Sequence, residues 1–175
     1  VVDLQARTVH LVQQLKGTKT QILDTRKTTP GIRALEKWAV QIGGGTNHRF
    51  ALYDMIMLKD NHIDFAGGIP QAIQKTQDYL KTHHLNLKII VEARSLEEVE
   101  MILKQDSVYR ILLDNFNYED TKKAVELIGG KCYSESSGGI TLETAKQYAA
   151  CGVDFISSGA LTHSVYNMDM SLKAI

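Results

Sequence analysis

The sequence predicts an α/β fold in which parallel strands alternate with helices and form a TIM-like βα barrel with fewer than eight regular strands. Short runs of strand-forming residues alternate with amphipathic stretches, which is typical of a parallel sheet covered by helices. Glu92, Asp114, Ser137 and Gly159 follow successive strands at intervals of 22, 23 and 22 residues. A barrel presents polar residues after every strand, whereas an open doubly wound sheet concentrates them at one switch point. The regular interval therefore favours the barrel.

The strands are expected where apolar and β-branched residues cluster in short runs. In chain order, these runs cover residues 20–24, 54–58, 87–91, 110–113, 131–134 and 153–157. A leading helix is expected in residues 1–19. Because no linker or low-complexity tract divides the chain, residues 1–175 are expected to form one barrel domain.

Four helices between the strands are expected from local start and stop residues, such as a proline in the first turn, a Ser-x-x-Glu capping box and a glycine after the last turn. In chain order, they cover residues 69–81, a stretch opened by Ser95, a stretch from Asn117 or Asp120 to Ile128, and a stretch from Thr141 to Gly152. Trp38 and the neighbouring Leu35 and Val40 are expected in core or interface packing.

The composition is that of an ordinary soluble globular protein, with 43% hydrophobic and 23% charged residues among 175. The 20 basic and 20 acidic residues cancel, which argues against a general nucleic-acid binder and requires any anion site to be built locally. No apolar run approaches the ~18 residues that span a membrane. We therefore expect a cytoplasmic protein that binds neither nucleic acid nor membranes.

The two cysteines, Cys132 and Cys151, are too few for a disulfide framework and form no CxxC pair. We expect reduced, buried thiols at both positions. No signal peptide is visible, and the chain begins with Val1 rather than Met. We therefore expect the chain to be part of a longer protein.

Two adjacent cations follow the first predicted strand, in the segment Asp24-Thr-Arg-Lys-Thr-Thr-Pro-Gly31. Arg26 offers a planar fork to a carboxylate, and Lys27 offers a movable point charge, so the segment can clamp an anion. The alternative is a solvated turn with surface cations.

A second cationic pair lies in the segment Gly43-Gly-Gly-Thr-Asn-His-Arg49. Its three glycines permit close approach of the backbone to a ligand, and His48 and Arg49 follow directly. The alternative is a flexible loop with a satisfied histidine.

A further cation, Lys59, follows the buried run 54–58 in the segment Leu58-Lys-Asp-Asn-His62. Lys59 is therefore expected at a strand end that faces the barrel mouth. Because a lysine there rarely lacks a partner, either a bound anion or an acidic neighbour such as Asp60 must supply one.

Two carboxylates, Glu92 and Asp114, each end a predicted strand on consecutive units. Carboxylates at a barrel mouth can hold sugar hydroxyls or Mg²⁺. The alternative is that they begin the following helices, where a negative charge favours the helix dipole.

Small residues follow the last two predicted strands, in the segments Glu135-Ser-Ser-Gly-Gly-Ile-Thr141 and Ser158-Gly-Ala-Leu-Thr-His-Ser164. Backbone N–H groups in such loops can point at a phosphate, and glycine allows the phosphate to approach closely. The last two units of a barrel are also the usual place for a phosphate. The alternative is a pair of ordinary tight loops.

These motifs, together with Leu113-Asp-Asn-Phe116, resemble those of the quinolinate phosphoribosyltransferases, also called nicotinate-nucleotide pyrophosphorylases. The resemblance runs in order from about Gly17 to the C-terminus. It implies transfer of phosphoribosyl from 5-phosphoribosyl-1-pyrophosphate to quinolinate, with decarboxylation, in de novo NAD synthesis. The implied products are nicotinate mononucleotide, pyrophosphate and CO₂, and Mg²⁺ is the implied cofactor.

The resemblance also implies roles for individual residues. It implies catalytic roles for Lys27, Lys59, Glu92 and Asp114, with Glu92 and Asp114 holding ribose hydroxyls and Mg²⁺. Contacts with quinolinate and the pyrophosphate end are implied for Arg26, Lys27, His48, Arg49 and Lys59, and contacts with the 5-phosphate for Ser137, Gly138, Gly159 and His163. The full set of implied substrate-binding residues also includes Thr25, Gly139, Ser158 and Ala160.

Members of this family carry an additional N-terminal sandwich domain, which has no counterpart in the 175 residues. In the family that domain covers the barrel mouth of the partner subunit and contributes an arginine to quinolinate. We therefore expect a homodimer or higher oligomer for the longer protein and little or no turnover by the present chain alone. The alternatives are a molybdenum-associated paralogue with another substrate and a non-catalytic phosphate-binding barrel.

Overall fold

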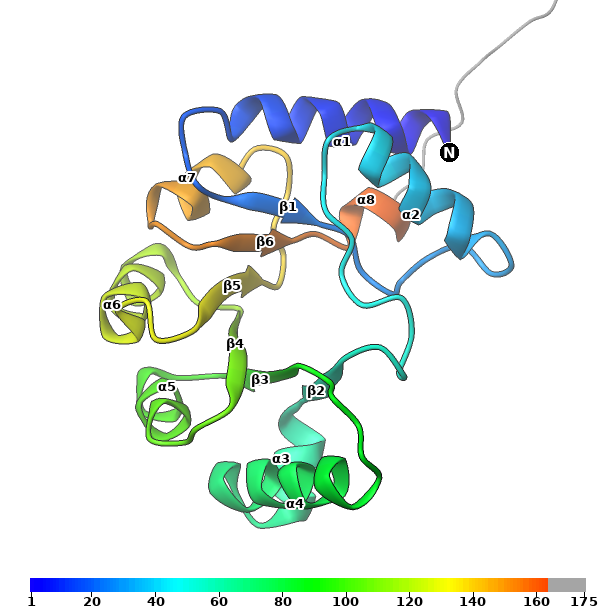
Figure 1. The fold of residues 1–175 in the computed structure, drawn as a ribbon. Helices are drawn as coiled ribbons and strands as arrows, with labels where there is room; N and C mark the ends of the chain where they lie inside the picture. The colour runs from blue at the N-terminus through cyan, green and yellow to red at the C-terminus, as the bar shows by residue number, and fades with distance from the viewer. Residues whose placement is uncertain (164–175) are drawn as a thin grey trace, which may run out of the picture.

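Six parallel strands form one curved sheet in the computed structural model, which describes residues 1–163 (Figure 1). Each strand overlaps one of the predicted runs, so all six predicted strands are confirmed. In chain order, the strands are β1 Gln21–Leu23, β2 Ile56–Leu58, β3 Ile89–Ala93, β4 Val108–Asp114, β5 Tyr133–Ser137 and β6 Phe155–Ser157. Because β5 extends to Ser137, beyond the predicted range 131–134, it brings Glu135 and Ser137 into the sheet.

The strand order is β1-β6-β5-β4-β3-β2, with every neighbouring pair parallel. The two edge strands are β1 and β2, and no strand pairing joins them within residues 1–163. An isolated parallel bridge between Leu23 and Thr46 places the loop of residues 43–55 against β1. We call the side of the arc between β1 and β2 the seam (Figure 1). The predicted α/β barrel is thus present as a curved sheet whose hydrogen-bonded ring is open at the seam.

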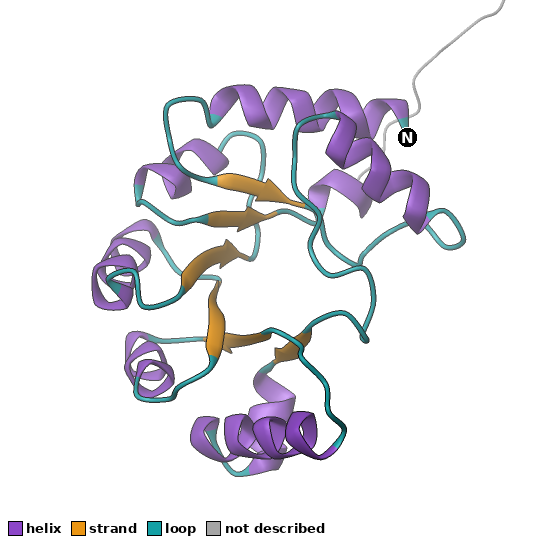
Figure 2. Cartoon of the chain, in the orientation of Figure 1, coloured by secondary structure: helices purple, strands orange, loops and turns teal. Residues whose placement is uncertain are grey.

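Helices lie on the outer side of the curved sheet (Figure 2). In chain order, they are α1 Val2–Gln14, α2 Arg33–Ile42, α3 Asp60–Ala66, α4 Ile69–Thr82, α5 Leu96–Leu103, α6 Tyr118–Ile128, α7 Ala145–Ala150 and α8 Ala160–His163. The leading helix and the four predicted interstrand helices correspond to α1, α4, α5, α6 and α7. The sequence analysis did not predict α2, α3 or α8.

Two of the predicted start residues, Ser95 and Asn117, act as helix caps, whereas α7 begins at Ala145 instead of the predicted Thr141. The Ser95 hydroxyl accepts the Glu98 N–H at 3.3 Å, and the Asn117 side-chain oxygen accepts the Asp120 N–H at 2.8 Å. Gly129 ends α6 in the left-handed conformation, with φ 53°. These contacts explain why the boundaries of α5 and α6 were predictable.

Alternation along the strands separates the core from the polar interior of the barrel. On β4, Ile111 and Leu113 are fully buried in a core shared with Ile102 of α5 and Ala124 of α6. The intervening residue Leu112 points to the other face. Similar alternation on the remaining strands leaves one apolar layer between the sheet and its helices.

Two sequence predictions about buried residues are confirmed only in part. Of the residues expected in core or interface packing, Val40 is fully buried, whereas Leu35 and Trp38 are 47% and 60% exposed and lie outside the core, so an interface role stays a prediction for both. Cys132 and Cys151 are free, but both are only half-buried. Within residues 1–163, no helix combines the length and the apolar character needed to cross a membrane.

Candidate active site

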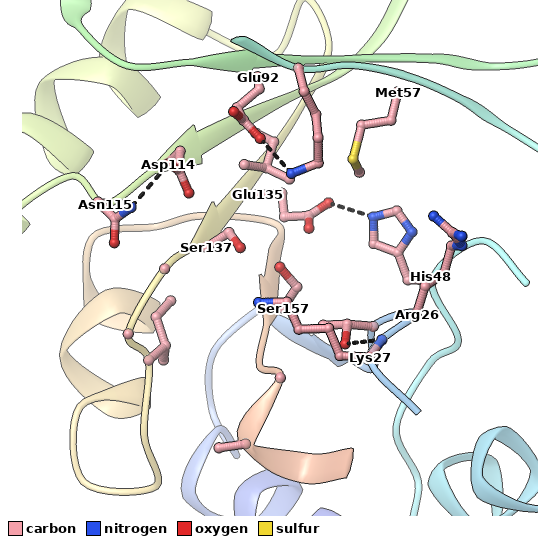
Figure 3. A pocket seen from close by; sticks show the side chains of 18 of the residues that line it. Arg26, Lys27, His48, Met57, Glu92, Asp114, Asn115, Glu135, Ser137 and Ser157 are labelled. Carbon is pink, nitrogen blue, oxygen red and sulfur yellow. Dashed lines mark hydrogen bonds and ion pairs between the residues drawn. The ribbon is translucent and has the colours of Figure 1, made fainter. Parts of the chain in front are cut away.

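A pocket of about 700 Å³ opens at the carboxyl ends of the strands (Figure 3). The parallel register aligns Asp114 with Ser137, and it aligns the residues that precede Lys59 and Glu92. Consecutive strand ends therefore deliver their polar side chains to one place. The pocket is lined by Thr25, Arg26, Lys27, His48, Arg49, Lys59, Glu92, Asp114, Ser137, Gly138, Gly139, Gly159, Ala160 and His163.

That set contains every predicted substrate-binding residue except Ser158. The Ser158 hydroxyl instead donates to the Ile140 carbonyl at 2.8 Å, and its backbone N–H donates to the Leu23 carbonyl at 3.2 Å. Ser158 is buried and joins β6 to the neighbouring loop. Ser164, the last residue of the predicted phosphate motif, lies outside the described residues.

Two guanidinium groups, those of Arg26 and Arg49, line the pocket and lie close enough for their charges to interact. Burial lowers the pKa of Arg49, and the positive charge of Arg26 lowers it further. The Arg26 Nε atom is buried and has no hydrogen-bond partner. Two repelling cations with an unused donor are favourable for a bound anion, which would compensate both charges. The arrangement argues against the alternative of a solvated surface turn.

The loop that carries His48 and Arg49 is held by a buried ion pair between Asp24 and Lys37. Lys37 Nζ lies 2.7 Å from Asp24 Oδ1 and donates to the His48 carbonyl at 3.0 Å. Asp24 Oδ1 also accepts the His48 N–H at 2.7 Å. Burial raises the pKa of Asp24, while the contact with Lys37 opposes that rise. The end of β1 and the helix α2 thus fix the backbone of His48 together.

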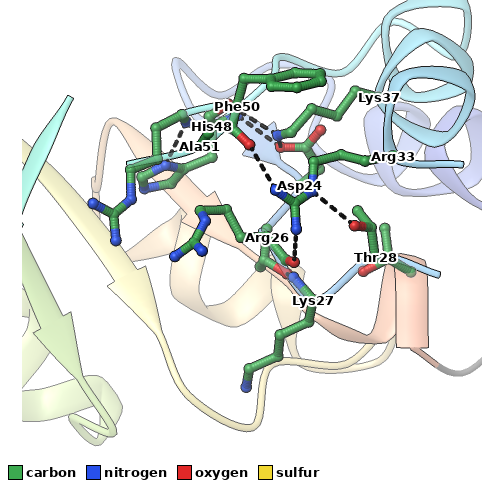
Figure 4. Close-up of polar contacts among 12 residues, drawn as sticks. Asp24, Arg26, Lys27, Thr28, Arg33, Lys37, His48, Phe50 and Ala51 are labelled. Carbon is green, nitrogen blue, oxygen red and sulfur yellow. Dashed lines mark hydrogen bonds and ion pairs between the residues drawn. The ribbon is translucent and has the colours of Figure 1, made fainter. Parts of the chain in front are cut away.

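The same helix also holds the segment that carries Arg26 and Lys27 (Figure 4). The Arg33 guanidinium donates to the Thr28 hydroxyl at 2.9 Å, to the Arg26 carbonyl at 3.2 Å and to the Phe50 carbonyl at 3.2 Å. One arginine therefore ties both cationic loops to α2. This role was not predicted from the sequence, because α2 was not recognised as a helix.

Lys59 and Glu92 form an ion pair across the ends of β2 and β3, with 3.0 Å between Nζ and Oε2. The partner of Lys59 is therefore an acid from the next strand rather than its neighbour Asp60. Asp114 accepts a hydrogen bond from the Asn115 side chain at 2.9 Å. Neither carboxylate caps a helix, since the caps of α5 and α6 are other residues.

The two carboxylates bear on the predicted magnesium ion. Within residues 1–163, no group of three or more His, Cys, Asp or Glu side chains has the arrangement of a metal site. Mg²⁺, however, is commonly held by one or two carboxylates together with substrate phosphates and water. Glu92 and Asp114 fit such a substrate-bridged ion and do not form a protein cage for a free one.

Glycines shape the predicted phosphate end of the pocket. Gly138 has φ +94°, and a Cβ added there would overlap the side chain of Asn115. A Cβ on Gly159 would lie 2.9 Å from the His163 ring. Gly138 therefore requires glycine, whereas a Cβ at Gly159 would require the His163 ring to shift. The Asn115 N–H donates to the Ser137 carbonyl at 2.9 Å and joins the loop after β4 to β5.

Two charged residues beneath the pocket were not predicted as site residues. Glu135 on β5 is fully buried and lines the pocket, and its Oε2 lies 2.6 Å from Arg110 Nη1 and 3.5 Å from His48 Nε2. Burial by itself raises the pKa of Glu135, but the contacts with His48 and Arg110 outweigh it and lower the pKa to about 2. An arginine within the apolar run 110–113 was the available sequence signal, because buried arginines need a partner.

Several apolar or neutral residues also line the pocket without having been predicted. Met57 and Leu112 point into it from β2 and β4, and the Arg49 guanidinium lies 3.7 Å from the Met57 sulfur. The other additional lining residues are Asn115, Ile140, Thr141 and Ser157. The pocket therefore offers apolar surface for a ring beside cations for acidic groups.

Comparisons with known proteins agree with this geometry. The profile of a family described as "Quinolinate phosphoribosyl transferase, C-terminal domain" matches residues 5–173. The chain is 50% identical to the chloroplastic nicotinate-nucleotide pyrophosphorylase [carboxylating] of Arabidopsis thaliana, with 87% of this chain and 48% of the relative covered. It is 43% identical to the Mycobacterium leprae enzyme of the same name, with coverages of 94% and 57%.

A solved structure shows the same fold. The crystal structure of nicotinate-nucleotide pyrophosphorylase from Ehrlichia chaffeensis matches with a TM-score of 0.89 and 41% identity. The match covers 95% of this chain and 59% of that one. The chain thus spans about half the length of the curated relatives that it matches.

Proposed function

Since the chain belongs to the quinolinate phosphoribosyl transferase C-terminal domain family, we propose that it is the catalytic barrel of an enzyme that joins quinolinate to 5-phosphoribosyl-1-pyrophosphate. The proposed reaction releases pyrophosphate and CO₂ and yields nicotinate mononucleotide. One observation carries the proposal: Arg26, Lys27, Arg49 and Lys59 converge on a single pocket that is also lined by the carboxylates of Glu92 and Asp114.

The side chains suit the charges of both substrates. Quinolinate has two adjacent carboxylates, which require several converging cations, and Arg26 and Arg49 offer planar forks for them. Met57 and Leu112 provide apolar surface against which a pyridine ring can lie. The arrangement would place the ring nitrogen beside the sugar carbon, and such positioning supplies much of the rate of a two-substrate reaction.

Departure of pyrophosphate leaves a sugar with oxocarbenium character and a leaving group with concentrated negative charge. Lys27 and Lys59 are mobile cations that can stabilise the charge on the leaving group. Glu92 and Asp114 are proposed to hold the ribose hydroxyls and a Mg²⁺ ion, which would stabilise negative charge on the leaving group. Gly138, Gly139, Gly159 and their neighbours would receive the 5-phosphate.

The proposal extends to the longer protein. An additional domain, supplied by a partner subunit in a homodimer or larger oligomer, would cover the pocket mouth and complete the quinolinate site. A cytoplasmic location is also proposed, although the Arabidopsis relative is named chloroplastic.

Calorimetry with quinolinate tests the proposed function directly. The chain is expected to bind quinolinate, and Arg49→Ala is expected to weaken binding by about 10-fold or more because it removes a charge-assisted hydrogen bond. Arg94→Ala is the matched control, since Arg94 is paired with Glu98 and does not line the pocket. Equal affinities of the two variants would overturn the proposal.

Turnover provides the second test. The full-length protein is expected to release CO₂ from quinolinate and form nicotinate mononucleotide in the presence of Mg²⁺, and the present chain alone is expected to do so weakly or not at all. Robust product formation by the 175-residue chain would contradict the expected need for another domain.

A further inference from the structure

A row of buried polar side chains crosses the barrel beneath the pocket and joins Arg110, Glu135 and His48. Arg110 Nη1 donates to Glu135 Oε2 at 2.6 Å, and the same oxygen lies 3.5 Å from His48 Nε2 (Figure 3). The side chains of Arg110 and Glu135 are 6% and 0% exposed. Each therefore depends on its partner for compensation of a buried charge.

The hydrogen bonds of His48 determine which ring nitrogen carries the proton. His48 Nδ1 accepts the backbone N–H of Arg49 at 2.6 Å, so Nδ1 has no proton of its own. The ring proton is consequently on Nε2, which faces the carboxylate of Glu135. A carboxylate in this position favours that tautomer and fixes the plane of the ring.

The position of His48 in the fold makes this anchoring important. His48 and Arg49 lie in the loop 43–55, at the seam where β1 and β2 are not paired. Asp24 and Lys37 hold the backbone of the loop from the β1 side. Glu135 reaches the loop from β5, which occupies the middle of the strand order, and holds the ring instead of the backbone.

A carboxylate beneath an anion pocket would oppose anion binding if its charge were not balanced. Arg110 supplies that balance from below, and its guanidinium carbon lies 4.0 Å from the centre of the Phe155 ring, which supports its orientation. The pair therefore gives His48 a strong acceptor without adding net negative charge to the pocket.

We propose that Glu135 and Arg110 are positioning residues for the quinolinate site: they hold the His48 ring, and through its Nδ1 they hold the backbone of Arg49 in the orientation that receives a carboxylate. The identity of this ligand rests on the function proposed above. The anchoring itself concerns only contacts within the chain.

A double-mutant cycle on the affinity for quinolinate tests the proposal. Glu135→Gln keeps the shape of the side chain and is expected to weaken quinolinate binding by about 10-fold, because it removes the negative charge that the His48 ring faces at 3.5 Å. In a His48→Ala background, the same substitution is expected to change affinity by less than about 2-fold. Glu98→Gln, which breaks an arginine pair outside the pocket, is the control and is expected to leave affinity unchanged. Equal losses from Glu135→Gln with and without His48 would overturn the proposal.

Nitrogen NMR of the His48 ring gives a readout that a merely structural role would not change. The wild-type chain is expected to show one fixed tautomer with the proton on Nε2, and Glu135→Gln is expected to give a mixture of tautomers. Unchanged ring shifts in the variant would overturn the proposal, whether or not the wild type binds quinolinate. A wild-type chain that does not bind quinolinate would instead overturn the proposed function. If Glu135→Gln does not fold, the double variant Arg110→Met with Glu135→Gln removes both charges and is expected to show the same mixture.

Discussion

Lys37→Met removes one partner of the buried ion pair that fixes the cationic loops. Lys37 Nζ lies 2.7 Å from Asp24 Oδ1, and the two side chains are 2% and 0% exposed. Loss of one partner from such a pair leaves an uncompensated buried charge and costs about 3–5 kcal/mol. We expect a loss of this size in the free energy of unfolding.

The chain contains a matched control for this substitution. Lys19 Nζ lies 2.7 Å from Asp154 Oδ1, but the Lys19 side chain is 60% exposed. Exposed pairs contribute about 0–1 kcal/mol, so Lys19→Met is expected to change stability little. Because atom types and distance are the same in both pairs, the comparison measures the combined effect of burial and of the second hydrogen bond from Lys37 to the His48 carbonyl.

Urea denaturation at several pH values measures both variants. Burial already raises the pKa of Asp24 above its ordinary value of 3.8, and removal of Lys37 raises it further. A carboxyl with a raised pKa in the folded state stabilises the fold below its unfolded pKa, and this contribution is lost as the pH rises through the folded pKa. Lys37→Met should therefore lose stability relative to the wild type as the pH rises above 3.8, the ordinary pKa of aspartate. Equal losses for the two lysine variants, or a difference independent of pH, would refute the reasoning.

Three further predictions concern single contacts. The pKa of Glu135 falls from 4.5 to about 2, so Glu135 stabilises the fold above pH 4.5 by about 3 kcal/mol and loses this effect toward pH 2. Denaturation curves should show a flatter acid dependence for Glu135→Gln, and parallel dependences would contradict this. Gly138→Ala should weaken binding of 5-phosphoribosyl-1-pyrophosphate by about 10-fold in calorimetry because the new Cβ overlaps a neighbour, whereas Gly139→Ala meets no atom within 4 Å and should weaken it less. The reverse order would be inconsistent with the loop geometry. Glu92→Gln should free Lys59 and tighten quinolinate binding by about 2- to 5-fold, less so at high salt, and weaker binding would show that Glu92 aids the acid site.

The strands were predictable because their local pattern and their burial agree. In the predicted run 87–91 every residue except Lys88 is apolar, and β3 is buried along its whole length between helices and barrel interior. The boundaries of α5 and α6 were equally accessible, since Ser95 and Asn117 make the cap contacts that their types favour. Local chemistry decided these elements.

The helix α2 was missed because its pattern is inverted. It buries Glu36 and Lys37 and exposes Leu35, Trp38 and Ile42, so its apolar residues do not mark the inner face. It also begins at a residue without a side-chain cap. The buried charges make sense only once the loops that they hold are known, because Glu36 accepts both the N–H and the hydroxyl of Thr29.

The site residues at strand ends could be predicted from the sequence, whereas those beneath the pocket could not. Lys59, Glu92 and Asp114 stand out because each follows an apolar run. Glu135 and Arg110 depend on a pairing between neighbouring strands, and their register cannot be obtained from either segment alone. Ser158 was expected at the phosphate end of the pocket because of its place in a motif, but its hydroxyl donates to the Ile140 carbonyl.

The seam between β1 and β2 also determines where the barrel opens most readily in solution. The strands in the middle of the order have paired neighbours on both sides, whereas β1 and β2 are three-residue edges. Amide hydrogens beside the seam should therefore exchange with heavy water earlier than those of β4 and β5. A ligand that contacts both Arg26 and Arg49 would connect the end of β1 to the loop 43–55. Slower amide exchange in residues 43–55 would then report ligand binding without any measurement of turnover.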